Sequence, residues 1–208
     1  MHPFIVLEGI DGSGTTTQVE KLAARIRDHI GIEGVVHTTR EPTSSRIGAL
    51  IRRQLRGELE FPFTDNTLAL LFAADRLDHI AHGIEPQLKR GPVISDRYLH
   101  SSIFYQSLTC KLKSNNLCHD PQTWIHVLNC QALKPTMTIV LDVPEEVAFQ
   151  RLQSRGGKPE LFERRELQAA LAIKYVHANT AHHVDGTRTI NRVADEVWKL
   201  VAPLFEKS

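Results

Sequence analysis

The stretch EGIDGSGTTTQ, from Glu8 to Gln18, directly follows the apolar run FIVL near the start of the chain. It has the spacing of the phosphate-binding loop G-x-x-x-x-G-K-[ST], with glycines at Gly9 and Gly14 and a hydroxyl residue at Thr16. Thr15 stands where that pattern has lysine. Glycines let consecutive backbone N–H groups turn toward an anion, and the N-terminus of the next helix adds its positive dipole. The alternative is an ordinary glycine-rich turn between a strand and a helix.

The composition limits the class of protein. A chain of 208 residues with 41% hydrophobic residues can bury one substantial core, so a single domain over residues 1–208 is expected. Charged residues make up 24%, and the formal net charge is only +1, which disfavours nucleic acid or an anionic membrane as partner. Neither an apolar run of about 18 residues nor a basic-then-apolar N-terminus is present, so a cytoplasmic protein is expected.

The cysteines also favour a cytoplasmic protein. Cys110, Cys118 and Cys130 cannot all pair within one chain, so reduced thiols are the simpler interpretation. Together with His119 and His126 they give the spacing C-x7-C-H…H-x3-C, which fits no common zinc template. A structural metal site is therefore not expected there.

Short apolar runs alternate with longer helical stretches along the chain. Strands are expected at Phe4–Glu8, Gly34–Thr39, Pro92–Asp96, Met137–Val143 and, with a weaker pattern, His182–Asp185. Helices are expected at about Thr16–Ile30, Ser45–Arg56, Asn66–Arg90, Pro121–Leu133, Pro144–Ser154, Glu160–Asn179 and Ile190–Phe205. The continuous apolar strands indicate burial on both faces, and the alternation predicts an α/β fold with a five-stranded parallel sheet flanked by helices.

Ligands of such folds bind beyond the carboxyl ends of the strands. Four predicted strand ends carry charged or glycine-rich clusters, namely EGID, TREP, SDRY and DVP. Because parallel strands end at the same edge of the sheet, these clusters are expected to converge. This convergence favours phosphate binding for the loop despite its missing lysine.

Individual residues in these clusters suggest roles. Arg40 in TREP lies beside a carboxylate, which could also be a surface ion pair. In LLFAADR, Phe72 and Arg76 lie one helical turn apart and could hold a base and its phosphate; alternatively, Phe72 is a core residue and Arg76 is solvated. Asp96 could hold Mg²⁺ through water, and Arg97 could bind a phosphate with two parallel hydrogen bonds.

The sequence resembles the thymidylate kinases. The resemblance rests on EGIDG, TREP and DRYxxSxxxYQ together and continues through the IGALIR, LLFAADRLDHI, KPTMTIVLDVPEEVAFQR, ELFERRELQAALAIKYVHAN and VDGTRTINRVADEVW segments. It implies a three-layer P-loop α/β fold with a short mobile lid at about residues 151–165. It also implies ATP-dependent phosphorylation of dTMP to dTDP in nucleotide biosynthesis, the use of Mg²⁺, and a homodimer formed through helices around Asn66–Ile80.

The resemblance implies site residues as well. The expected dTMP contacts are Asp11, Arg40, Glu41, Pro42, Phe72, Arg76, Arg97, Ser101, Ser102, Tyr105 and Gln106. The expected ATP contacts are Gly12, Ser13, Gly14, Thr15, Thr16, Thr17 and Arg151, and the expected Mg²⁺ residues are Thr16 and Asp96. The expected catalytic residues are Asp11, Arg40, Arg97, Arg155 and Lys158.

The roles implied for the acceptor side are specific. Asp11 holds the sugar 3′-hydroxyl, while Arg40 and Arg97 bind the acceptor phosphate. Phe72 stacks on thymine, and Arg76 reaches the edge of the base. In the family, the residue at the position of Tyr105 crowds a ribose 2′-hydroxyl, and a cis bond often precedes the proline of TREP.

The sequence departs from the family pattern at several positions. Thr15 replaces the loop lysine, TREPTSS replaces TREPGGT, Thr136 replaces an aspartate, and Leu161 replaces a lid arginine. Removing one preorganised donor from a transition state typically costs about 3–4 kcal/mol. The replacement cation is expected among Arg155, Lys158, Arg164 and Arg165, although the last two could simply solvate a helix face.

Two other functions remain open from the sequence. The first is another nucleoside or nucleotide kinase of the same fold. The second is a catalytically weak nucleotide-binding protein, for which Thr15, Thr136 and Leu161 are the arguments.

Overall fold

The computed structural model describes residues 2–31, 36–110, 120–156 and 160–206. Within these ranges, five strands form one sheet in the order β2-β3-β1-β4-β5, and every neighbouring pair is parallel. The strands are β1 (Phe4–Glu8), β2 (His37–Arg40), β3 (Val93–Asp96), β4 (Met137–Asp142) and β5 (His182–Asp185). The predicted five-stranded parallel α/β fold is thereby confirmed.

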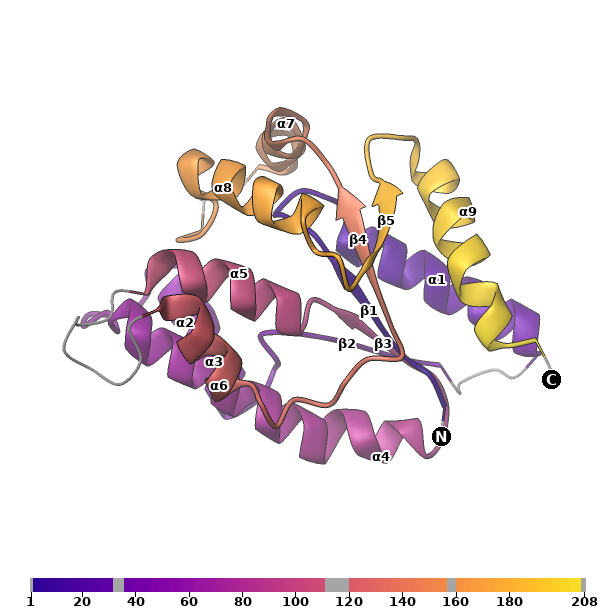
Figure 1. The fold of residues 1–208 in the computed structure, drawn as a ribbon, viewed down its shortest axis with the longest axis horizontal. Coiled ribbons are helices and arrows are strands. Elements are labelled where there is room, and N and C mark those ends of the chain that lie inside the picture. Colours follow the sequence, from indigo (N-terminus) through magenta and orange to yellow (C-terminus); the bar gives the residue numbers. More distant parts are fainter. Residues whose placement is uncertain (1, 32–35, 111–119, 157–159, 207–208) are drawn as a thin grey trace.

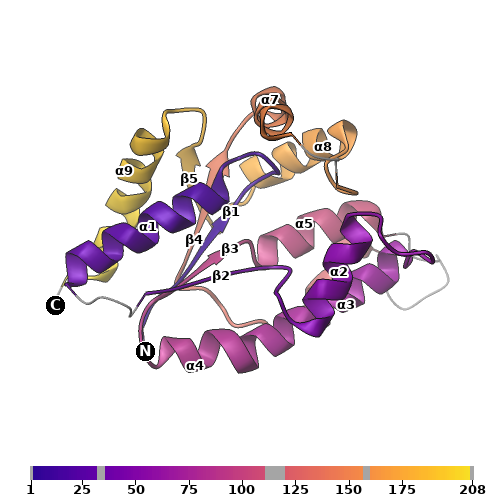
Figure 2. The same ribbon diagram turned by 180° about the vertical axis from the view of Figure 1, so that it is seen from behind.

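Helices cover both faces of the sheet (Figure 1). They are α1 (Thr15–Ile30), α2 (Arg46–Leu55), α3 (Asp65–His79), a π-helical turn (Ile80–Ile84), α4 (Glu85–Leu88), α5 (Leu99–Thr109), α6 (Pro121–Leu128), α7 (Glu145–Arg155), α8 (Arg165–Val176), α9 (Ile190–Val201) and a 3₁₀ turn (Ala202–Leu204). Helices α1 and α9 lie side by side on one face, as the view from behind also shows (Figure 2). No helix of the described residues is long and apolar enough to cross a membrane.

The alternation of side chains along β1 explains how the sheet holds both helix layers. Successive side chains of a strand point to opposite faces. Ile5 and Leu7 belong to the apolar cluster shared with α1 and α9, whereas Phe4 and Val6 belong to the cluster beneath α4. All five residues of β1 are buried because the strand is the centre of the sheet.

The two edge strands correct the expectation of strands buried on both faces. β2 alternates between half-buried and exposed residues, and only Val184 of β5 is buried. Each edge strand has one neighbour in the sheet, so one side remains open to solvent. Residues 34 and 35, at the start of the predicted strand Gly34–Thr39, lie outside the described residues.

Helix α5 (Leu99–Thr109) was absent from the sequence prediction, which is wrong at this point. Its first turn has no side-chain cap from its own segment. Instead, the backbone N–H groups of Tyr98 and Ser101 donate to the buried Glu8 Oε1 at 2.9 and 3.2 Å. Because this cap comes from a residue about 90 positions earlier, the local sequence carries no start signal for the helix. The predicted Asn66–Arg90 helix is likewise interrupted by the π-helical turn.

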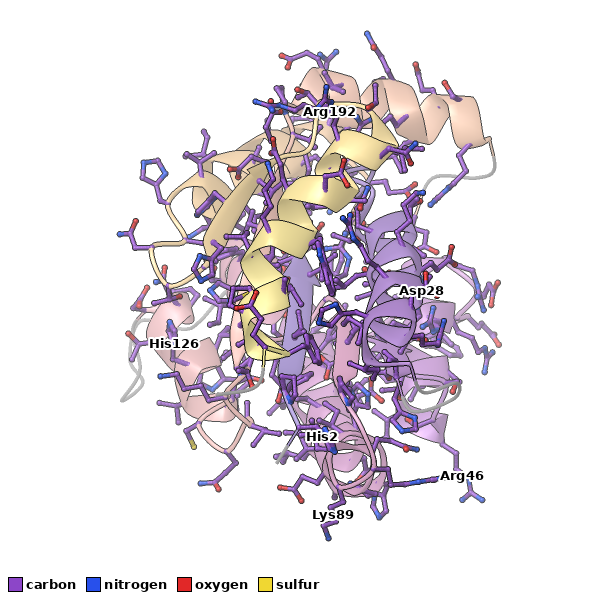
Figure 3. All side chains as sticks on the ribbon, turned by 90° about the vertical axis from the view of Figure 1, so that its right-hand side faces the viewer. His2, Asp28, Arg46, Lys89, His126 and Arg192 are labelled. Carbon is purple, nitrogen blue, oxygen red and sulfur yellow. The ribbon has the colours of Figure 1, made fainter. Side chains whose placement is uncertain are left out.

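The carboxyl ends of the strands define the functional edge of the sheet. In Figure 3, His2, just before β1, lies toward one end of the molecule. Arg192, in the first turn of α9 after β5, lies toward the other end. In the β1–β3 register, Leu7 lies opposite Asp96, so the two strands end together. After β1 the chain continues to β2 at one edge of the sheet, and after β3 it continues to β4 in the opposite direction. Ligands of this class of fold bind at the point between two such strands.

Candidate active site

The loop after β1 has the backbone that a phosphate cradle requires. Gly12 and Gly14 have φ angles of 85° and 97°, which favour glycine. A Cβ at Gly12 would lie 2.4 Å from the carbonyl oxygen of Ala148 in α7, so the loop packs against that helix. Helix α1 begins at Thr15 immediately after Gly14, and its first N–H groups are unpaired by the helix itself. The loop can therefore offer several N–H donors to one anion.

The carboxyl end of β3 places Asp96 beside this loop. The Thr16 hydroxyl donates to Asp96 Oδ2 at 2.5 Å, and Arg40 Nη2 lies 3.0 Å from the same oxygen. Arg40 Nη2 also donates to Thr16 Oγ1 at 3.1 Å. Burial alone would raise the pKa of Asp96, but the Arg97 charge and the surrounding hydrogen-bond donors outweigh it and lower that pKa. Asp96 is therefore ionised at neutral pH.

These residues fit a magnesium site of the kind that phosphates complete. Asp96 Oδ1 is buried without a hydrogen-bond partner among the described residues. Mg²⁺ commonly binds through one or two carboxylates together with water and substrate phosphates. Thr16 and Asp96 supply a hydroxyl and a carboxylate, and the described residues contain no larger cluster of metal-ligating side chains.

Arg97 and Asp11 form the next part of the site. Arg97 has a φ of 72°, an unusual value for a residue with a side chain. Its guanidinium donates to Asp11 Oδ1 at 2.7 Å and to the Gly9 carbonyl at 2.9 Å. Burial raises the pKa of Tyr105, so its hydroxyl stays protonated and donates to Asp11 Oδ2 at 3.1 Å. This network fixes the Asp11 carboxylate at the mouth of the loop.

Gln168 of α8 completes this network and was missed by the sequence analysis. Its amide nitrogen donates to Asp11 Oδ2 at 2.7 Å, and its oxygen accepts from the Asp11 backbone N–H at 3.0 Å. The residue is buried, and it shares the buried face of α8 with Leu171 and Tyr175. The signal that the sequence offered for Gln168 was a polar residue among the apolar residues on the buried face of α8.

Arg76 is not solvated, which excludes that alternative. Its side chain is 2% exposed, and Nη2 lies 2.5 Å from the buried Glu41 Oε2. Nη1 donates to Asn129 Oδ1, while Nε is buried without a partner in the described part of the chain. Glu41 also contacts His79 Nδ1 at 3.0 Å. The expected cis bond precedes Pro42.

Gln106 on the neighbouring helix α5 also has an unpartnered buried polar atom within the described residues. Gln106 is 2% exposed, and its Oε1 has no hydrogen-bond partner among the residues described. Leaving a buried acceptor unsatisfied costs about 1–3 kcal/mol. Phe72, Arg76 and Gln106 all line one cavity, so a ligand there can contact these three side chains.

This cavity, of about 790 Å³, joins the loop to the Phe72 region. Every predicted site residue lines it except Lys158, which lies outside the described residues. Arg52 of α2 also lines it and was not predicted, although it belongs to the IGALIR segment. Burial, and then the charge of Arg40, lower the pKa of Arg52. Two neighbouring cations on one wall favour an anion between them.

The candidate substitutes for the loop lysine lie in different places. Arg155 lines the cavity, and its mostly exposed guanidinium lies 3.3 Å from Glu163. Arg165 instead binds Glu145 at 2.7 Å and does not line the cavity. Arg164 donates to the carbonyl of Leu161 and also lies outside the lining. The geometry therefore singles out Arg155 among the described lid cations proposed from the sequence.

Two departures from the family pattern have structural roles. In TREPTSS, the hydroxyls of Thr43 and Ser45 donate to the buried Asp75 at 2.5 and 2.9 Å. Thr136 Oγ1 accepts from the backbone N–H of Phe4 at 3.0 Å, at the start of β1. Thr43, Ser45 and Thr136 do not line the cavity.

Comparison with known proteins identifies the family. The thymidylate kinase family model matches residues 7–197. The chain belongs to the thymidylate kinase family. The resemblance in EGIDG, TREP and DRYxxSxxxYQ is thereby confirmed, and the chain is a kinase of this family.

Curated thymidylate kinases align over almost the whole chain. A probable thymidylate kinase of Methanococcus maripaludis (strain C6) is 36% identical, covering 97% of this chain and 96% of that protein. A probable thymidylate kinase of Methanocaldococcus jannaschii is 37% identical, covering 93% and 90%. The solved thymidylate kinase from Candida albicans shares the fold with a TM-score of 0.75, at 24% identity, over 97% of this chain and 92% of that one.

Proposed function

We propose that this thymidylate kinase family member transfers the γ-phosphate of ATP to dTMP, giving dTDP for nucleotide biosynthesis. The observation that carries the proposal is one cavity that joins the phosphate loop to Phe72, Arg76 and Gln106. Transfer is direct, because the acceptor phosphate is itself the nucleophile and is already ionised near neutral pH. Catalysis therefore consists of positioning and charge stabilisation.

Two polar side chains of the cavity match the edge of thymine. The Arg76 guanidinium would donate to the O4 carbonyl, and the Gln106 amide would accept from N3–H. Cytosine presents an acceptor at N3 and a donor at N4, the opposite pattern. Phe72 contributes the apolar surface on which the base stacks. The Glu41 carboxylate holds Arg76 in place, since losing one partner of a buried ion pair typically costs about 3–5 kcal/mol.

The sugar and acceptor phosphate lie between the base and the loop. Asp11 binds the 3′-hydroxyl, and Tyr105 excludes a 2′-hydroxyl. Arg97, Arg40 and the unpredicted Arg52 surround the acceptor phosphate, all three on the wall of the same cavity. A planar guanidinium can make two parallel hydrogen bonds to a phosphate, which fixes its orientation for attack.

The donor phosphates lie on the loop. Backbone N–H groups from Gly12 to Thr17 bind them, and Arg151, anchored to the Ser13 and Gly186 carbonyls, borders that region. Thr16 and Asp96 would hold Mg²⁺, which would supply positive charge beside the donor phosphates. Arg155 supplies the positive charge that Thr15 lacks, by exchanging Glu163 for phosphate oxygens.

Dependence of ADP formation on dTMP tests the function. Purified protein with Mg·ATP is expected to release ADP with dTMP, more slowly with dUMP, and negligibly with dCMP, UMP or thymidine. Thymidine lacks the phosphate, UMP carries the 2′-hydroxyl, and dCMP has the wrong base edge. An equal rate with UMP would indicate another nucleotide kinase, and no ADP release with any acceptor would indicate a nucleotide-binding protein without turnover.

A homodimer through α3 is part of the same proposal. Leu70 and Leu77 are 49% and 46% exposed and lie two turns apart on this helix, within the predicted segment Asn66–Ile80. Sedimentation is expected to give twice the 23.5 kDa of one chain. Leu77→Glu should shift the protein toward the single chain, because the charge would be buried in the interface. Wild-type protein sedimenting as a single chain at high concentration would contradict the dimer.

A further inference from the structure

His79, the last residue of α3, belongs to the LLFAADRLDHI segment but was given no role from the sequence. It lies three positions after Arg76 and seven after Phe72, on the buried face of the helix. Its side chain is buried, with 7% of the residue exposed. His79 does not line the acceptor cavity, whereas Phe72 and Arg76 do. Any effect of His79 on a bound nucleotide must therefore pass through its neighbours.

Both ring nitrogens of His79 have partners. Nδ1 lies 3.0 Å from Glu41 Oε1, and Nε2 lies 2.6 Å from Thr39 Oγ1. A carboxylate oxygen can only accept a hydrogen bond, so Nδ1 carries a proton and donates it to Glu41. In the neutral ring Nε2 is then an acceptor, and the Thr39 hydroxyl donates to it. The ring is thus held between strand β2 and the Glu41 carboxylate.

Glu41 joins His79 to Arg76, with one carboxylate oxygen for each. Oε1 accepts from His79, and Oε2 lies 2.5 Å from Arg76 Nη2. The carboxylate cannot turn without breaking one of these two bonds, so His79 fixes the plane in which Glu41 binds Arg76. All three residues are buried, and hydrogen bonds between buried groups are strong because no water competes for them.

The turn that follows α3 makes room for the His79 ring. The π-helical turn Ile80–Ile84 begins directly after His79. Gly83 of this turn lies against the imidazole, because a Cβ at Gly83 would be 2.9 Å from His79 Cδ2, too close for the ring to keep its position. Single π-helical turns within helices occur frequently at functional sites. The backbone therefore defines where the ring lies, independently of the hydrogen bonds that the ring makes.

We propose that His79 is a positioning residue of the acceptor site. It holds the Glu41 carboxylate and, through Glu41, the Arg76 guanidinium that meets the base. The inference rests on the proposed function and adds to it a residue that sets the affinity for the base without touching it.

The expected defect follows from the contacts of Glu41. Without the His79 N–H, Glu41 Oε1 loses its donor inside the protein, and the carboxylate is free to turn away from its present plane. Arg76 is then less ordered before the nucleotide binds, and the nucleotide must order it at a cost in affinity. The groups around the phosphates come from the loop after β1 and from the residues that follow β2 and β3, so the chemical step is affected less.

The experiment measures dTMP binding to the full chain by calorimetry without ATP, together with kcat and KM for dTMP. His79→Leu removes both hydrogen bonds, whereas His79→Asn keeps an N–H donor near the position of Nδ1. We expect His79→Leu to weaken dTMP binding about tenfold with a much smaller change in kcat, and His79→Asn to recover most of the binding. Gly83→Ala keeps every hydrogen-bonding group but displaces the ring, so we expect dTMP binding about threefold weaker.

The matched ligand is 2-deoxyribose 5-phosphate, measured as a competitor of dTMP. It has the sugar and the phosphate but no base, so it makes no use of Arg76. Its affinity should therefore be the same for wild type, His79→Leu and Gly83→Ala. A general loosening of the cavity would instead weaken both ligands.

Three results would overturn the inference. They are unchanged dTMP binding in His79→Leu and Gly83→Ala, equal weakening of dTMP and 2-deoxyribose 5-phosphate, and equal weakening of dTMP binding in His79→Asn and His79→Leu. If His79→Leu does not fold, the first two criteria are applied to Gly83→Ala. Wild-type protein that binds dTMP without phosphorylating it contradicts the proposed function and leaves this test intact. Wild-type protein that does not bind dTMP contradicts both.

Discussion

Replacing Arg97 with alanine is expected to lower kcat/KM for dTMP by about 10³-fold. Its guanidinium donates to Asp11 at 2.7 Å and to the Gly9 carbonyl at 2.9 Å, so one side chain orders both the sugar contact and the loop. Alanine removes the phosphate donors and leaves Asp11 with fewer partners. Steady-state rates with varied dTMP and saturating ATP measure the loss.

Arg97→Lys is the matched control for this prediction. Lysine keeps the charge but cannot make the two parallel hydrogen bonds of a guanidinium, so we expect only partial recovery of kcat/KM. Both substitutions retain a Cβ at the φ of 72°, so neither changes the backbone strain at this position. Binding of an ATP analogue should weaken much less than kcat/KM for dTMP in both variants, because the loop N–H groups and Arg151 remain. A kcat/KM for Arg97→Ala within tenfold of wild type would contradict the proposed role.

The second large effect is expected at Arg155, the cavity-lining cation of the lid. Arg155→Ala should lower kcat by about 10²–10³-fold, with little change in KM for dTMP, because it removes charge stabilisation from the donor side. Arg165→Ala is the matched control, since Arg165 binds Glu145 and does not line the cavity. Its loss should change kcat by no more than about twofold, because this ion pair lies outside the cavity.

Restoring the loop lysine tests whether Arg155 and position 15 supply the same charge. In a Thr15→Lys background, the effect of Arg155→Ala on kcat should shrink, because two groups serving one function are not additive. The four kcat values of this double-mutant cycle decide the point. If Arg155→Ala keeps wild-type kcat, or costs the same factor with and without Lys at position 15, Arg155 does not replace the lysine.

Much of the fold was readable from local sequence. The apolar runs FIVLE and MTIVLD predicted central strands, and both lie inside the sheet. The helix expected at about Thr16–Ile30 corresponds to α1 (Thr15–Ile30), which lies between Gly14 and Gly31. These features are local, since strand burial, helix periodicity and glycine turns depend on neighbouring residues. The parts that depend on distant residues were not predicted, such as α5, which is capped by Glu8.

The site residues also divide into those that local sequence predicted and those that it did not. Residues at strand ends and in the loop were predicted because a parallel sheet brings its carboxyl ends together. Three others were not predicted: Arg52 and Phe162 line the cavity from α2 and from the segment before α8, and Gln168 of α8 bonds to Asp11. Their roles depend on helix packing across the sheet edge, which no local pattern specifies.

By itself, the sequence determined the parallel α/β class, the phosphate loop from Gly9 to Thr16, and the motifs that resemble thymidylate kinases. Only the tertiary structure decided which charges are paired within the protein and which buried polar atoms lack a partner. Arg165 is held by Glu145, whereas Gln106 Oε1 and Arg76 Nε are buried and unpartnered within the described residues. The physical reason is that charge and hydrogen-bonding capacity belong to residue types, whereas their satisfaction depends on neighbours that folding brings from elsewhere in the chain.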